Sequence, residues 1–316
     1  MESDSADSRA QSDYCLTASE ARARGIDCDK APAPETCPFC GKALEHSGLL
    51  SPLATDEPRI AIWFENTEDC ECAEYMQAKA ERIVAEERER EERELREAQE
   101  RVQKRLLRSN IKPRFLTRTF DAFNETDENS RPLKMAHKYV ATFDERKREG
   151  MGLYFIGPVG TGKTHLAVAV AIDLIGRGVP ALFTTSPDLL DSIRETYSAK
   201  TSQEEVITPY RSTELLVLDD LGKESPSDWT CSILFSLIND RYESMLPTIV
   251  TTQYDDEELC RRLAKAGDIK TAEALVSRLR EVCYPVDMQG PDWRNGEEHE
   301  HQHRMRHREP YPRSRA

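Results

Sequence analysis

The stretch LYFIGPVGTGKTHLAVAV, residues 153–170, decides the fold, because an apolar run meets a glycine-rich loop that leads into a second apolar run. Its central part, GPVGTGKTH, matches the phosphate-loop pattern G-x-x-x-x-G-K-[ST] at every fixed position. A strand before such a loop and a helix after it are the structural context that gives the pattern its meaning. The stretch therefore predicts a strand, a phosphate-binding loop and a helix.

The residue types in this loop suit a triphosphate and its magnesium ion. Glycines let backbone N–H groups approach phosphate oxygens closely, and the positive end of the following helix dipole favours an anion. Lys163 is expected to contact the β and γ phosphates, and the Thr164 hydroxyl is expected to bind Mg²⁺. We expect ATP to be bound by Gly157, Pro158, Val159, Gly160, Thr161, Gly162, Lys163, Thr164 and His165.

Two later strand ends carry the polar side chains that such a site needs. The run LLVLDD, residues 215–220, places Asp219 as a water-mediated Mg²⁺ ligand and Asp220 as the group that orients or deprotonates the attacking water. In a sheet of this type, the strand that ends at TTQY, residues 251–254, lies between the other two. Gln253 is the candidate for orienting water or the γ phosphate there, and a solvent-facing residue is the alternative.

The composition limits the class of protein. With 316 residues, the chain holds one large domain and a small one, and its net charge of -14 excludes a generally basic nucleic-acid coat protein. No apolar stretch approaches the roughly 20 residues that cross a bilayer. We expect a soluble, cytoplasmic protein in which any DNA contact comes from a local patch.

Cysteine spacing near the N-terminus predicts a metal site. CPFC at residues 37–40 and CEC at residues 70–72 offer four thiolates in two pairs, which suit a tetrahedral Zn²⁺ ion held by Cys37, Cys40, Cys70 and Cys72. The CxC spacing is tighter than usual, so Cys28 or His46 stays an alternative ligand. Free thiols are the alternative to a metal site. The histidines at 299, 301 and 303 are expected to be solvated residues of a polar tail.

Composition along the chain suggests five segments. Residues 76–108 form part of a helix without Gly or Pro that begins near Ala73 and carries acid-before-base pairs such as Glu97 and Arg101. Apolar runs alternate with helical patterns after the loop, which predicts a parallel sheet between helices. The predicted segments are a disordered arm at 1–27, a cysteine-rich zinc-binding module at 28–75, the charged helix at 76–108, an ATPase domain at 109–294 and a disordered tail at 295–316.

Several motifs in this order resemble one family. FDAF, GPVGTGKTHLA, FTTSPDLLDSIRETY, LLVLDDLG, INDRYESMLPTIVTT and SRLREVCYPVDMQGPDWR look like the AAA+ ATPases of the DnaC-like helicase loaders and the IstB-like transposition ATPases, over roughly residues 111–294. The resemblance implies a P-loop AAA+ three-layer α/β sandwich with a parallel sheet, here preceded by the zinc module and the long charged helix. It also implies that the loop is Walker A, that Asp219 and Asp220 are Walker B, and that Gln253 is the first sensor.

The resemblance further implies an arginine finger, an oligomer and a DNA contact. Of the two arginines in SRLRE, Arg278 is preferred over Arg280 as the residue that reaches a neighbouring subunit's site. Single-stranded DNA would contact the helical segment at about residues 186–210, with phosphates met by Arg194, Lys200 and Arg211. The family usually has asparagine where this chain has Gln253, which affects the expected hydrolysis rate more than nucleotide binding. The chain is also too short after its last strand for the helical lid of larger AAA+ proteins.

These observations leave three functions open. The first is an ATP-dependent loader that delivers a replicative DNA helicase to single-stranded DNA, with a homo-oligomer formed through the AAA+ domains. The second is an IstB-like transposition helper ATPase. The third is a nucleotide-sensing adaptor with little hydrolysis, an alternative kept open by Asp220 and Gln253 in place of glutamate and asparagine. The zinc module and charged helix favour the loader, because they resemble a protein-docking arm.

Overall fold

The computed structural model describes residues 15–28, 30–51, 59–67, 69–198, 202–264 and 269–293. The chain forms two compact units, Met1–Arg96 and Glu97–Ala316, and the division falls inside one continuous helix. In the described part of the chain, no helix combines the length and the apolar character needed to span a membrane. The predicted tail at 295–316, with its three histidines, lies outside the described residues.

The smaller unit contains a three-stranded antiparallel sheet and one short helix. The sheet has the order β1-β4-β5, with β1 at Cys15–Thr17, β4 at His46–Leu50 and β5 at Ile60–Thr67. Helix α2 (Ala18–Ala23) starts with a capping box in which Thr17 and Glu20 bond each other's backbone N–H. A second pair of strands, β2 (Glu35–Thr36) and β3 (Ala43–Leu44), encloses the CPFC segment.

The sequence prediction of a disordered arm over residues 1–27 is wrong for residues 15–27. Leu16, Ala21 and Ile26 are buried there and pack against Trp63 and other apolar residues of the sheet. Burial of these side chains stabilises a segment that has few large apolar residues of its own. Residues 1–14 lie outside the described part.

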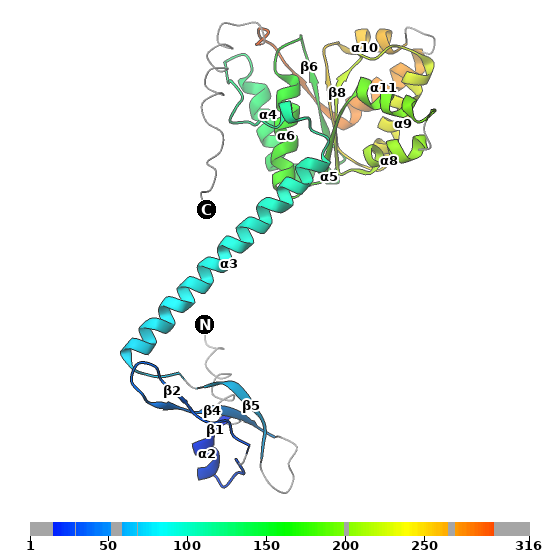
Figure 1. Ribbon diagram of the computed structural model, residues 1–316. Coiled ribbons are helices and arrows are strands. Elements are labelled where there is room, and N and C mark those ends of the chain that lie inside the picture. The colour runs from blue at the N-terminus through cyan, green and yellow to red at the C-terminus, as the bar shows by residue number, and fades with distance from the viewer. Residues whose placement is uncertain are drawn as a thin grey trace. The chain divides into compact units, whose positions relative to one another are not determined.

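Helix α3 (Ala73–Arg108) is the long charged helix, drawn in cyan in Figure 1. It runs for 36 residues and buries none of them. Exposed ion pairs at i,i+4 accompany its surface, including Glu97 with Arg101 at 3.7 Å. Such pairs add only a few tenths of a kcal/mol each, about 0.3–0.5. The helix therefore depends on the good helix propensity of its Glu, Arg, Ala and Leu residues.

The larger unit is an α/β sandwich. Its strands are β6 (Gly152–Ile156), β7 (Ala181–Thr185), β8 (Leu215–Leu221), β9 (Thr248–Thr252) and β10 (Cys283–Asp287). They pair in parallel in the order β10-β6-β9-β8-β7. Strand β9 thus lies between the strand before the phosphate loop and the strand that ends in the two aspartates, as the sequence predicts.

Helices cover both faces of this sheet, as Figure 1 shows for α4 and α6 on one side and α8, α9 and α11 on the other. Alternate residues of β8 face the two cores: Leu215 and Val217 join the first cluster, and Leu216 and Leu218 join the second. The parallel sheet between two helical layers confirms the predicted fold class. These helices are α4 (Ser130–Ala141), α6 (Lys163–Gly176), α7 (Ser186–Glu195), α8 (Gln203–Ser212), α9 (Asp228–Glu243), α10 (Asp256–Leu263) and α11 (Ile269–Val282).

Two details of the helices differ from the sequence prediction. The helix expected near residues 132–147 is divided at Thr142 into α4 and α5 (Phe143–Arg148). The helical segment expected at about residues 186–210 is likewise divided into two helices, α7 and α8, although α8 contains Pro209. The signal for the start of α8 was the capping box formed by Ser202 and Glu205, which fixes its first turn.

Candidate nucleotide-binding site and metal centre

The phosphate loop joins β6 to α6, and three of its residues need the conformational freedom of glycine. Gly157, Gly160 and Gly162 have φ angles of 151°, 84° and 94°. A Cβ atom on Gly157 would lie 2.1 Å from the carbonyl oxygen of Met288, and one on Gly160 would lie 1.9 Å from Asp292 Oδ1. At these two glycines, the backbone of the loop therefore packs closely against the segment that follows β10. The sequence did not reveal this contact.

Lys163 begins helix α6 and holds the loop in shape. Its ammonium group donates hydrogen bonds to the carbonyl oxygens of Gly157 at 2.7 Å and Pro158 at 2.6 Å. The Thr161 hydroxyl also donates to the carbonyl of Pro158, at 3.0 Å. A buried positive charge at the N-terminus of a helix makes this end of α6 a strong anion site.

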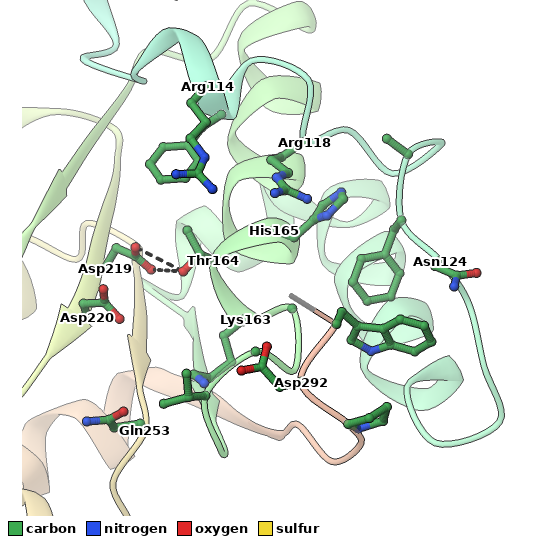
Figure 2. Close-up of a pocket in the computed structure, with 18 of the residues that line it drawn as sticks. Arg114, Arg118, Asn124, Lys163, Thr164, His165, Asp219, Asp220, Gln253 and Asp292 are labelled. Carbon is green, nitrogen blue, oxygen red and sulfur yellow. Dashed lines mark hydrogen bonds between the residues drawn. The ribbon is translucent and has the colours of Figure 1, made fainter. Parts of the chain in front are cut away.

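Thr164 and Asp219 meet across the gap between the loop and β8. The Thr164 hydroxyl is 2.9 Å from Asp219 Oδ1 and 3.1 Å from Oδ2 (Figure 2). The structure thus brings together the two predicted magnesium ligands, a hydroxyl and a carboxylate, which are the hard oxygen donors that Mg²⁺ prefers.

Thr251 at the end of β9 is a residue that sequence reasoning missed. Its hydroxyl donates to Asp219 Oδ1 at 2.6 Å and accepts a hydrogen bond from the backbone N–H of Asp220 at 3.0 Å. The sequence signal was the position of Thr251 at the end of a strand, because the carboxyl ends of adjacent parallel strands meet at the same edge of a sheet. Thr251 therefore connects the third strand end to both aspartates.

The two aspartates occupy an irregular part of β8. The pairing of β8 with β9 shifts between Leu218 and Leu221, and Asp220 has a left-handed φ of 61°. Both aspartates line the cavity; Asp219 is 2% exposed, whereas Asp220 is half-buried and forms an ion pair with Lys223 at 2.8 Å. Burial and the neighbouring charge of Asp220 raise the pKa of Asp219 to about 6, against hydrogen bonds from Thr251 and Thr164 that lower the pKa. A cation beside Asp219 would favour the ionised carboxylate.

Gln253 lines the same cavity from the end of β9. Its amide donates a hydrogen bond to the hydroxyl of Tyr254. The side chain is half-buried, so it is positioned at the site that the sequence predicts, between the phosphate loop and the aspartates.

The cavity has a volume of about 450 Å³, and two walls of it come from segments far from the loop in sequence. One wall is the segment at 109–124, which contributes Arg114, Arg118 and Phe123. The other is the segment at 291–293, which ends with Trp293. Within the loop itself, the residues that line the cavity are Val159, Gly160, Gly162, Lys163, Thr164 and His165.

The predicted site residues Gly157, Pro158 and Thr161 belong to the loop but do not line the cavity. His165 lines the cavity, and a contact of 2.8 Å between its Nε2 atom and the carbonyl oxygen of Thr119 fixes the orientation of its ring. The loop residues thus divide into those that face the cavity and those that shape the turn.

Arg278 does not line this chain's own cavity. Its guanidinium group lies 4.9 Å from the ring centroid of Phe235 and 5.4 Å from that of Tyr242. Its Nε atom is buried without a hydrogen-bond partner in the described part of the chain. Arg280 instead pairs with Asp256. The contact of Arg278 with a neighbouring subunit therefore stays a prediction.

Two of the three residues expected to contact DNA phosphates, Arg194 and Arg211, have partners within the chain. Arg211 is 24% exposed and forms ion pairs with Glu204 at 2.9 Å and Asp240 at 2.7 Å, and its DNA contact stays a prediction. Arg194 pairs with Asp191 and stacks over Trp229, yet stays partly exposed. Lys200 lies outside the described residues. The helices α7 and α8 do occupy the predicted segment.

The smaller unit contains the predicted cysteine cluster. The Sγ atoms of Cys37, Cys40, Cys70 and Cys72 all lie within 4.8 Å of one another. Cys37 and Cys72 are 3.8 Å apart, and Cys40 and Cys70 are 3.4 Å apart. A tetrahedral zinc ion with Zn–S bonds of about 2.3 Å holds its sulfurs roughly 3.8 Å from one another. The four thiols therefore fit Zn²⁺.

Neither alternative ligand belongs to the cluster. The Cys28 thiol lies 3.2 Å from the carbonyl oxygen of Ile26 in the separate apolar core of this unit. His46 Nδ1 lies 3.0 Å from the carbonyl oxygen of Phe64. Desolvation raises the pKa of Cys37, but hydrogen bonds that include the backbone N–H groups of Cys40 and Phe39 outweigh it and bring the pKa to about 7. A thiolate, the form that binds metal, is thereby favoured at Cys37, whereas desolvation raises the pKa of Cys72 to about 12.

Comparison with known proteins supports the nucleotide site. The replicative helicase loader DnaC of Escherichia coli (strain K12) is 29% identical over 167 residues, which cover 52% of this chain and 67% of DnaC. A putative insertion sequence ATP-binding protein, y4iQ/y4nD/y4sD, of Sinorhizobium fredii (strain NBRC 101917 / NGR234) is 30% identical over 181 residues, which cover 57% of this chain and 56% of that protein. The matches thus span between about half and two thirds of these relatives.

A crystal structure of the DnaC helicase loader matches with a TM-score of 0.50 and 27% identity, over 56% of this chain and all of that one. The likeness supports the AAA+ fold predicted from the sequence. The model of the family described as IstB-like ATP binding protein matches residues 69–301, a range that contains the phosphate loop and both polar strand ends. Because this match covers most of the chain, the protein belongs to the family of IstB-like ATP binding proteins.

Proposed function

We propose that this protein is an ATP-dependent loader that delivers a replicative DNA helicase to single-stranded DNA in the cytoplasm. The observation that carries the proposal is the presence, on one chain, of the Lys163, Thr164 and Asp219 cluster and of a separate compact unit with four gathered cysteines. The first supplies a nucleotide-dependent step, and the second supplies a surface for a protein partner. The similarity of about half of the chain to a protein named as a replicative helicase loader supports the loader role.

The chemistry of the nucleotide site follows from its geometry. The loop and Lys163 bind the phosphates, Thr164 and Asp219 hold Mg²⁺, and Asp220 orients or deprotonates the attacking water with Gln253 beside it. Arg278 completes the site of a neighbouring subunit in a homo-oligomer, and this role agrees with its absence from the lining of its own cavity. Zn²⁺ on the four cysteines stabilises the smaller unit.

The second candidate is a transposition helper ATPase that binds duplex DNA and recruits a transposase. Its support is the family membership and the similarity to a putative insertion sequence ATP-binding protein. A third candidate, an adaptor that senses nucleotide with little hydrolysis, rests on Asp220 and Gln253 at positions where relatives usually carry glutamate and asparagine.

Co-purification of the tagged protein with either partner class separates the first two candidates. The loader requires retention of the replicative helicase with ATP present and its loss with Lys163→Ala. Retention of a transposase instead would establish the second candidate. Phosphate release measured with and without single-stranded DNA tests the third, which requires turnover near background although calorimetry shows ATP uptake.

A further inference from the structure

Two arginines reach the nucleotide cavity from a segment that the loop motif does not include. The segment at 109–124, named the strap here, follows directly after α3 and leads to α4. Arg114 belongs to the short 3-10 helix η1 (Pro113–Phe115), and Arg118 follows three residues after η1. Both line the cavity together with Lys163, Thr164 and Asp219. Figure 2 shows the two guanidinium groups extending from the strap toward the side where Thr164 and His165 lie.

The strap is fixed to the larger unit at several points. The backbone N–H of Phe183 donates to the carbonyl oxygen of Ser109 at 2.8 Å, and Lys112 pairs with Asp188 at 2.6 Å. Phe115 packs against Phe183 with ring centroids 5.6 Å apart. Further along, His165 holds the carbonyl of Thr119. The two guanidinium groups are therefore carried by a segment tied to β7, α7 and α6.

Charge favours phosphate as the ligand of these arginines. A triphosphate carries more negative charge than one Mg²⁺ ion and Lys163 neutralise, and Lys223 is already paired with Asp220. The Arg114 side chain makes no ion pair or hydrogen bond with any described residue, although it lines a cavity that also contains acidic groups. A planar guanidinium group binds two phosphate oxygens at once, which a single lysine ammonium does not do.

The apolar part of the cavity provides a different surface. Phe123 and Trp293 line it with flat rings, and Ala122 lines it next to Phe123 in sequence. Aromatic faces suit stacking against a nucleobase, so we assign the base to these rings and the phosphates to the arginines.

We propose that Arg114 and Arg118 bind the phosphates of a nucleotide held in the same chain, and that bound nucleotide thereby further stabilises the strap that follows α3. The inference rests on the proposed nucleotide site and deepens it, because it adds two phosphate ligands and a route from the nucleotide to the end of the long helix. The ligand class is a nucleoside triphosphate with its full phosphate chain.

The test compares ATP with inorganic tripolyphosphate, which has the phosphates but no base. Both are titrated by competition with a fluorescent ATP analogue, using the full-length protein and its Arg114→Ala, Arg118→Ala and doubly substituted variants. We expect each single substitution to weaken both ligands roughly tenfold, and Arg→Lys at the same positions to restore part of the loss. Arg148→Ala, an exposed arginine of α5 outside the cavity, should change neither affinity.

Hydrogen exchange supplies a second measurement that is independent of activity. ATP should slow amide exchange across residues 109–124 in the wild-type protein and should have a much smaller effect in the double variant at saturating ATP. If tripolyphosphate binds all variants with equal affinity, so that the substitutions weaken at most the binding of ATP, the arginines do not contact phosphate and the inference is wrong. Failure of the wild-type protein itself to bind ATP would instead overturn the proposed function.

Discussion

At the scale of single residues, the most informative feature is the hydroxyl of Thr251. It bonds Asp219 with its proton and accepts the N–H of Asp220 with its oxygen, so one buried side chain orients both acidic residues. Because Asp220 has a left-handed backbone, this anchor also helps to hold a conformation that non-glycine residues rarely adopt. Thr251 is thus a positioning residue for the magnesium site.

Thr251→Val retains the shape of the side chain and removes the hydroxyl. A hydrogen bond to a charged group contributes about 1.5–3 kcal/mol, so the Mg²⁺-dependent part of ATP affinity should fall roughly tenfold or more. Calorimetric titration of ATP with and without Mg²⁺ measures this difference. Thr251→Ser, which keeps the hydroxyl, is the matched control and should stay close to wild type. Equal Mg²⁺ dependence in the valine variant would contradict the assignment.

Arg278 can be tested as a residue that acts on a neighbouring site. Arg278→Ala should leave ATP binding intact and lower hydrolysis by roughly a thousandfold, the effect typical of an arginine finger. Lys163→Ala removes the phosphate contact in its own site but keeps Arg278. A mixture of the two inactive variants should therefore regain turnover if they assemble together. Phosphate release from the mixture that equals the sum of the separate variants would rule out action between subunits.

At the scale of elements, the phosphate loop depends on the segment after β10 as well as on β6 and α6. The backbone N–H of Met288 donates to Ile156 at 2.7 Å, and that of Trp293 donates to Gly160 at 3.3 Å. These bonds place the 288–293 segment directly against the loop. The glycines at 157 and 160 are therefore needed for packing against the protein itself, in addition to any contact with phosphate.

Gly157→Ala should destabilise the loop, because its Cβ would lie 2.1 Å from the Met288 carbonyl and its φ angle is unfavourable for alanine. We expect a loss of about 1–3 kcal/mol in the free energy of unfolding and weaker ATP binding. Gly176→Ala is the control, since a Cβ at this last residue of α6 meets no atom within 4 Å. It should be neutral or stabilise by up to about 1 kcal/mol. Denaturant unfolding of both variants decides the outcome.

Local pattern was sufficient to predict the central elements but not all of the chain. The apolar run before Gly157 and the run before Asp219 identified two strands whose ends form one site, because each motif is continuous in sequence. The separate start of helix α8 was missed because its apolar residues are few and its proline suggests a break. Residues 15–27 were misjudged because their order comes from packing against Trp63, which lies far along the chain.

At the scale of the whole molecule, the walls of the cavity explain what sequence reasoning could not find. Arg114 and Arg118 lie outside the quoted motifs, and Trp293 lies in a motif to which the sequence assigned no contact with the cavity; the two segments lie on either side of the loop in sequence. Only the parallel sheet and its connections bring them together. The side chains of the loop could be predicted from the sequence, whereas the rest of the cavity required the fold.

The division into two compact units gives a prediction for metal removal. Cys37→Ser, or a strong chelator, should remove one bound zinc ion and unfold the smaller unit, because its own apolar core is small. The larger unit should keep its melting temperature and its stabilisation by ATP, which identifies its transition in calorimetry. Cys28→Ser changes a cysteine of the same unit outside the cluster and should leave the zinc content unchanged. A chain that contains no zinc after purification without chelators would refute the metal centre.

The contacts of Met288 and Trp293 with the phosphate loop have a practical consequence for experiments. A protein shortened to end at Asp287 would retain all five strands of the large sheet, yet one side of its ATP cavity would be open to water. Fragments designed from strand boundaries alone should therefore fold and still bind ATP poorly. Measurements of nucleotide affinity on this protein need the residues that come after its last strand.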